Sequence, residues 1–313
     1  KGIGNKFSKE YRSLFRLDNV RGTAPVKEAH YLNDNALSVI FGPKPNIHKA
    51  EHLDPAKWAK TSKTSSPVLT PHQFNELKKG AINLRAVMPA FCTGQRMLDT
   101  IDEVVDAIEA AISNGKQRII ISDHPENLAE FDHYTPLPFD LLMARIRHRL
   151  GTQQTEDLDI IVDTIRHSNI ADIISIFPLG AKAVYPQSIY SPDFLSLDEA
   201  KNYRKSMEKI IKDGVKSYGL SNLISWRNNS SVIKPNQVGR SLTEFMGWST
   251  EQTWSEDFPH GKTASKIAQA YHLHYSGQEG PDANSTTRFS KDNSNKIFRG
   301  GTAKTMLDRA QSY

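Results

Sequence analysis

Residues 81–123 carry a strand–helix–strand pattern, and this pattern constrains the fold more than any other part of the sequence. Apolar residues alternate with other residues over 81–88, as in a strand. Thr100 and Glu103 then form a capping box, followed by an amphipathic helix that ends at Asn114-Gly115. The run from Gln117 to Ser122 is typical of a buried strand. Two strands joined by a helix favour a parallel pair, so we expect a sheet with helical crossovers.

The rest of the region 70–275 predicts more helix than strand. Capping boxes and apolar stripes predict helices that begin near residues 71, 139, 156, 196, 241 and 263, and β-branched runs predict strands at 170–177 and 181–185. The basic cluster at 145–149 is interpreted as a match to the negative end of its helix. The fold class we predict is α+β: a compact, mixed, helix-rich core over 70–275 that contains the unit at 81–123.

Both flanks of this core are polar and rich in turn-forming residues. Residues 1–69 are broken repeatedly by glycine and proline, and 276–302 contain few apolar side chains that burial could use to offset the entropy of ordering. Residues 1–70 hold 12 Lys or Arg and 6 Asp or Glu, so the N-terminal flank is basic. We therefore predict an extended basic N-terminal arm with loops over 1–69, and a polar C-terminal arm over 276–313 that ends in a short helix.

Long arms beside a compact core indicate a subunit of a large assembly. We predict a structural protein of the viral capsid or nucleocapsid type, in which homo-oligomeric neighbours exchange arms. The apolar residues available for such interfaces are Phe7, Tyr11, Leu14, Phe15, Phe289, Ile297, Phe298, Met306 and Leu307. If nucleic acid is a partner, the phosphate contacts are Lys1, Lys6, Lys9, Arg12, Arg16 and Arg21. An accessory subunit of a heteromeric organellar or ribosomal complex is the alternative assembly.

The composition excludes several other classes of protein and of site. The single cysteine, Cys92, excludes an internal disulfide framework and a multi-cysteine zinc site, which suits a reducing compartment or a virion. No apolar run approaches the length of a membrane span, so no membrane partner is expected. We predict no cofactor and no metal, and no complete catalytic constellation is visible, which favours a structural protein over an enzyme.

Two enzymatic alternatives rest on short motifs. Asp123 and His124 directly follow the strand that ends at Ser122, which is where α/β enzymes place catalytic groups. The pattern Ile121-Ser-Asp-His124 resembles the polymerase-and-histidinol-phosphatase family of metallohydrolases, which implies a metal-dependent hydrolase.

The second motif set lies elsewhere in the chain. Ser13-Leu-Phe-Arg16-Leu-Asp18 resembles the arginine strand of ADP-ribosyltransferases. Thr64-Ser-Ser66 and Gln154-Thr-Glu156 are similar to the later elements of that family. The resemblance implies that Arg16 orients a dinucleotide and that Glu156 is catalytic.

Overall fold

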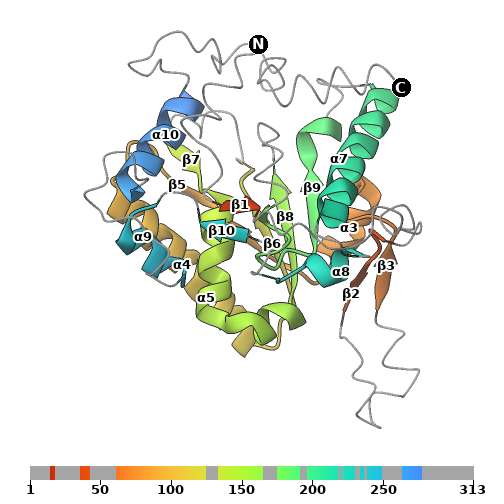
Figure 1. Ribbon diagram of the computed structural model, residues 1–313, viewed down its shortest axis with the longest axis horizontal. Helices are drawn as coiled ribbons and strands as arrows, with labels where there is room; N and C mark the ends of the chain where they lie inside the picture. Colours follow the sequence, from red (N-terminus) through yellow and green to blue (C-terminus); the bar gives the residue numbers. More distant parts are fainter. Residues whose placement is uncertain are drawn as a thin grey trace.

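A four-stranded parallel sheet lies at the centre of the molecule (Figure 1). The computed structural model describes residues 15–17, 36–42, 61–124, 133–164, 175–190, 196–217, 220, 222–229, 233–235, 238–248 and 263–276. The sheet has the order β4 (Ile82–Arg85), β6 (Arg118–Ser122), β8 (Asp159–Thr164) and β9 (Ala183–Pro186). Mixed helices and strands confirm the predicted α+β class, and β4 and β6 confirm the predicted parallel pair.

The centres of the two middle strands are β-branched and buried. Ile119–Ile121 of β6 and Ile160–Val162 of β8 are each at most 1% exposed. A parallel sheet covered on both faces requires such continuous apolar runs. Two steps along the sheet use helical crossovers: α4 (Gly94–Ser113) lies between β4 and β6, and α5 (Phe139–Asp157) lies between β6 and β8.

Other elements surround this sheet. α3 (Pro71–Lys78), α7 (Leu197–Ser217) and α8 (Leu223–Trp226) lie on the right of Figure 1, and α9 (Arg240–Phe245) and α10 (Ala264–Ser276) lie on the left. A 3-10 turn, η4 (Gln187–Tyr190), follows β9. Three antiparallel pairs complete the described fold: β1 (Phe15–Leu17) with β10 (Ile233–Pro235), β2 (Val39–Phe41) with β3 (Ser62–Thr64), and β5 (Val87–Pro89) with β7 (Tyr134–Pro136). In the part of the chain that the structure describes, none of the helices has the length and apolar composition of a membrane span.

Several predicted helix boundaries are confirmed by the hydrogen bonds at their ends. Thr70 and Gln73 form a reciprocal capping box at the start of α3, and Ser196 and Glu199 do the same before α7. The predicted start of α4 at Thr100 is wrong. Thr93 caps that helix by accepting from Arg96 N, and the Thr100 hydroxyl instead donates to Arg96 O at 2.8 Å within the helix.

The predicted helix over 156–167 is also wrong. α5 continues to Asp157, with a break in helical geometry at Gly151 (φ 75°), and the chain then enters β8. Acidic residues near 156 suggested a helix start, but Ile160, Ile161 and Val162 favour a strand, and burial between β6 and β9 decides in its favour.

Described segments of the predicted N-terminal arm belong to the core. Leu37, Phe41, Val68 and Leu69 are buried in the same apolar cluster as the sheet. Residues 36–42 and 61–69, which lie within the segment predicted as an arm with loops, therefore contribute side chains to the core. The predicted core boundaries at 70 and 275 remain predictions.

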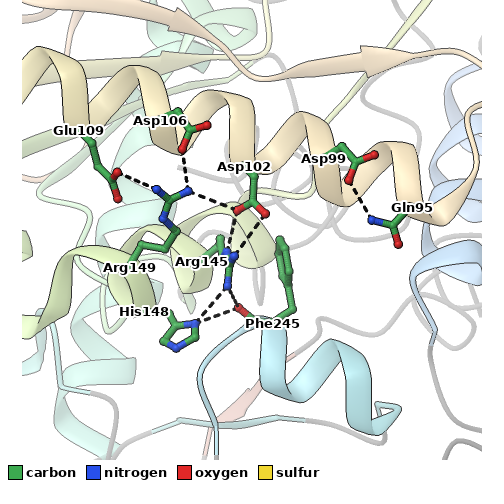
Figure 2. Close-up of polar contacts among 9 residues, drawn as sticks. All are labelled: Gln95, Asp99, Asp102, Asp106, Glu109, Arg145, His148, Arg149 and Phe245. Carbon is green, nitrogen blue, oxygen red and sulfur yellow. Dashed lines mark hydrogen bonds and ion pairs between the residues drawn. The ribbon is translucent and has the colours of Figure 1, made fainter.

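The basic cluster of α5 pairs with the side of α4 and does not cap its own helix. Figure 2 shows the arrangement. Arg145 binds both carboxylate oxygens of Asp102, at 2.7 and 3.2 Å, and Arg149 binds Asp106 and Glu109 at 2.7 and 2.6 Å. The hydrogen bond to Asp106 raises the pKa of Arg149. The acids lie three or four residues apart on α4, so they share one face and form a ladder for the arginines.

Arg145 also connects α5 to the end of α9. Its guanidinium donates to Phe245 O at 3.1 Å and lies 4.2 Å from the centroid of the Phe245 ring (Figure 2). One side chain therefore holds three helices together, which sequence periodicity cannot specify.

We expect a double-mutant cycle of Asp102→Ala and Arg145→Ala to give a coupling energy of about 1 kcal/mol. The ion pair is bidentate and the Arg145 side chain is only 18% exposed, so its coupling energy should exceed that of an ordinary surface ion pair. Urea unfolding of the four proteins measures it, and the coupling should fall in 1 M salt. A cycle of Lys79→Ala and Glu76→Ala, an exposed pair, is the control and should give a smaller value. Equal couplings for both pairs would contradict the role given to Arg145.

Arg227, directly after α8, fixes the end of α5 by binding backbone carbonyls. Its guanidinium donates to the carbonyl oxygens of Thr155, Glu156, Leu158 and Gly180 at 2.9–3.2 Å. These include carbonyls at the end of the helix that have no partner within it. Burial lowers the pKa of Arg227 to about 10, so the side chain remains charged at neutral pH.

Gly94, the first residue of α4, lets α10 approach closely. A Cβ at this position would lie 2.3 Å from Ser265 N and 2.5 Å from Ala264 C, which are backbone atoms that a side-chain rotation cannot move. Gly94→Ala should therefore destabilise the protein by about 1–3 kcal/mol, as overpacking does elsewhere. Thermal unfolding measures the loss, and Gln95→Ala, at the exposed neighbouring position, is the matched control. An unchanged melting temperature for Gly94→Ala would show that α10 can move away from α4 without loss.

Candidate functional site

Polar residues form a row across the sheet at its carboxyl edge. Arg85 of β4 pairs with Ser122 of β6, Ser122 with Asp163 of β8, and Asp163 with Tyr185 of β9. Register partners in neighbouring strands project from the same face, and the strands lie about 4.8 Å apart. The row therefore presents a guanidinium, a hydroxyl, a carboxyl and a phenol side by side on one face. It runs from exposed Arg85 to buried Asp163 and Tyr185.

Asp163 is the most unusual member of this row. It is 7% exposed, and its Oδ2 accepts from Ser122 Oγ at 2.8 Å. Its Oδ1 is buried and has no hydrogen-bond partner among the described residues. Burial raises the pKa of Asp163 to about 7, and the nearby Asp123 carboxylate acts in the same direction. Near neutral pH this carboxyl group is therefore able to hold or release a proton.

A second hydroxyl–carboxylate pair occupies the opposite face of the same edge. Thr164 Oγ1 donates to Asp123 Oδ2 at 2.9 Å, and Asp123 is 1% exposed. Each residue directly follows a member of the first pair, and successive strand residues project to opposite faces. The edge thus holds one acid on each face, and each acid accepts from a hydroxyl of the neighbouring strand.

An aromatic stack closes the β9 end of the row. The Tyr185 ring lies between Phe74 of α3 and Tyr190 of η4, with ring centroids at 4.1 and 5.8 Å and interplanar angles of 8°. Burial, and secondarily the charge of Asp163, raises the pKa of Tyr185. Tyr185 is therefore a neutral phenol at physiological pH, held in a fixed position beside the acid.

The amino edge of the sheet carries a different, fully paired network. Asp159, at the start of β8, forms ion pairs with Lys182 and with Arg118, the latter at 3.3 Å, and accepts from Gly42 N at 2.8 Å. Asp159 and Lys182 are each 2% exposed. Every Asp159 contact is with a cation or a backbone donor, so this edge is a structural junction.

The predicted site residues have different positions in the structure. Asp123 lies on the acidic edge, and the half-buried His124 contributes its backbone N–H to Ser122 Oγ at 3.1 Å. Within the part of the chain that the structure describes, no three His, Cys, Asp or Glu residues are grouped to hold a metal ion. Cys92 is half-buried, and burial raises the pKa of its thiol.

The residues predicted for the arms fall almost entirely outside the described residues. Phe15 and Arg16 are described as part of β1, which pairs with β10. Phe7, Tyr11, Leu14, Phe289, Ile297, Phe298, Met306 and Leu307 lie outside, as do Lys1, Lys6, Lys9, Arg12 and Arg21. The predicted interface and phosphate contacts therefore remain predictions.

Asp163 is the site residue that sequence reasoning missed. It falls inside the helix predicted over 156–167, although the run Asp159-Ile-Ile-Val-Asp-Thr164 has the β-branched centre of a buried strand. An acid at the carboxyl end of such a run was the available signal, and it matches the position of Asp123 after β6.

The comparisons with known proteins identify the family. A family model described as the glutamate synthase central domain matches residues 27–232, which is about two thirds of the chain. No curated protein matches the chain. This match is to a family of enzyme domains, so the predicted viral capsid or other structural coat protein is wrong. The family also replaces the alternative functions considered above, which are a hydrolase using Asp123 and His124, a transferase using Arg16 and Glu156, and an accessory subunit. The chain belongs to the glutamate synthase central domain family.

Proposed function

We propose that this chain acts as a domain of a glutamate synthase and is required for the formation of glutamate by that enzyme. The observation that carries the proposal is the family match over 27–232, which includes all four strands of the parallel sheet and both of its crossover helices. Because fold alone does not determine function, the match supports membership in the enzyme, and the carboxyl edge is the place to look for a direct contribution.

The two edges of the sheet differ in how their acids are paired. At the amino edge, Asp159 is paired with Lys182, Arg118 and the backbone N–H of Gly42. The carboxyl edge keeps a buried carboxyl oxygen of Asp163 without a partner among the described residues. Such groups are rare in native proteins, and the strain of keeping one is typical of functional sites.

Genetic complementation tests the proposal with the whole natural gene that encodes this chain. The gene should restore growth, without added glutamate, to a bacterial strain that lacks glutamate synthase. Asp159→Ala, which we expect to destabilise the sheet, should weaken the rescue, whereas Lys79→Ala, at an exposed site, should preserve it. The proposal fails if the natural protein accumulates in folded form but supports no growth.

A further inference from the structure

We propose that His272 is a proton-sensitive latch, which holds α10 and the turn before α4 against the core only while its imidazole is neutral. The inference is independent of the proposed function, because it concerns how two segments of the fold stay packed. It rests on the burial of His272, on its hydrogen bond to Phe91 and on the strained backbone of Phe91.

His272 occupies a core-facing position of α10. The buried residues described in this helix are Ile267, Ala268, Tyr271 and His272, which recur at the spacing of one helical face. The helix packs against α4 and β7 (Figure 1). Since His272 is only 6% exposed, a positive charge on its imidazole would lose most of its hydration.

The hydrogen bond that His272 makes requires the neutral imidazole. Its Nδ1 accepts from the backbone N–H of Phe91 at 3.3 Å, so the ring proton is on Nε2. Nε2 is buried and has no acceptor among the described residues. Protonation of Nδ1 would therefore remove the acceptor of Phe91 and create a buried cation at the same point.

The backbone of Phe91 is strained, and His272 is the contact that holds it. The φ angle of Phe91 is 58°, in the left-handed region that a bulky residue rarely adopts. Its ring is 68% exposed and lies against the imidazole, with 3.4 Å between the ring centroids. Because such strain persists only where surrounding contacts fix the backbone, loss of the His272 contact should release the turn together with α10.

The charges on the elements around α10 do not stabilise a cation at His272. The titratable and charged groups described in the turn before α4, in the first turns of α4, at β7 and on α10 are Cys92, Arg96, Asp99, Asp102, Glu103, His133, Tyr134, Lys266 and Tyr271. The acids among those on α4 have other partners: Glu103 pairs with Arg96, Asp102 with Arg145, and Asp99 accepts from Gln95. Burial lowers the pKa of His272 from its ordinary value of 6.5, and it is the cause that acts on this group.

The sign of the pH dependence follows from this lowered pKa. The released form takes up a proton more readily than the packed form, so packing of α10 is strongest above about pH 6.5 and weakens as the pH falls below it. Hydrogen exchange of the full 313-residue chain, followed by mass spectrometry between pH 7 and pH 5, tests this. Protection factors, which correct for the intrinsic pH dependence of exchange, should fall about fivefold or more in α10 and in residues 90–93. Those of β6 and β8 should not fall.

His272→Gln keeps a side-chain acceptor that does not titrate, so protection of α10 in this variant should not depend on pH. His133→Gln is the matched control, because it makes the same change at an exposed histidine directly before β7, and it should keep the full response. If His272→Gln does not fold, an NMR titration of the His272 ring in the parent chain decides the question, with an expected midpoint below 6.5. The proposal is overturned if α10 of the parent chain is equally protected at pH 5 and pH 7, if His133→Gln abolishes the response, or if the His272 ring titrates at or above 6.5.

Discussion

Replacement of Asp163 by Asn should stabilise the protein at pH 8 by about 1–3 kcal/mol. The carboxyl of Asp163 has its pKa raised from 3.8 to about 7 by burial, so ionising it in the folded state costs on the order of 4 kcal/mol. Asparagine removes that penalty and keeps an oxygen that can accept from Ser122, but its amide N–H groups lack acceptors, which costs about 1–3 kcal/mol. The expected net stabilisation is the ionisation cost that asparagine removes minus the cost of its unpaired amide N–H groups.

The pH dependence has a definite sign. Because the folded-state pKa lies above the unfolded value, the folded protein binds the proton more tightly. The stability contributed by Asp163 is therefore fully present below about pH 4 and is lost as the pH rises to about 7. Stability curves from urea unfolding at pH 5, 6, 7 and 8 should show the advantage of Asp163→Asn growing with pH and then levelling off. Asp99→Asn, the same change at an exposed site, should show no such growth. An advantage that does not change with pH would show that Asp163 is not the titrating group.

Replacement of Asp159 by Ala should destabilise the protein by about 3–5 kcal/mol, the largest single loss we expect. The variant leaves Lys182 charged, 2% exposed and without its acceptor, and it also deprives Gly42 N of its partner. Arg118 loses the same acceptor but is 21% exposed and can turn toward water. Urea unfolding at neutral pH measures the effect.

The double variant Asp159→Leu with Lys182→Met distinguishes the contribution of the ion pair to stability from that of the other Asp159 contacts. If the loss in Asp159→Ala comes from the stranded lysine, replacing both partners with apolar side chains should recover much of the stability. A double variant as unstable as the single one would instead assign the loss to Gly42 and Arg118, and hence to the docking of 36–42 on the sheet.

Local signals in the sequence predicted the elements whose structure depends on near neighbours. The capping box at Thr70 and the glycine at 80, with φ 79°, delimit α3 because both act within one turn of the helix. The same signals misplaced the start of α4 at Thr100, where a Thr-x-x-Glu pattern in the interior of a helix looks identical to one at its end. Local patterns cannot distinguish these cases, because the difference lies in whether the preceding turn is helical.

Amino-acid composition did not predict the family to which this chain belongs. Polar flanks suggested an assembly subunit, but the family match concerns 27–232, where the core lies, and points to an enzyme. Composition reports how much apolar surface a segment can bury, and this quantity carries no information about the chemistry of a site.

The sequence by itself determined the strand–helix–strand order of the unit 81–123 but not the start of its helix, because alternation and the helical period are properties of neighbouring residues. It also placed Asp123 after a buried strand. Only the tertiary structure decided that Arg85, Ser122, Asp163 and Tyr185 form one row, since residues 100 positions apart meet through strand order and register. It likewise decided that the arginines of α5 bind α4, because packing selects the partner of a long charged side chain and its sequence neighbours do not.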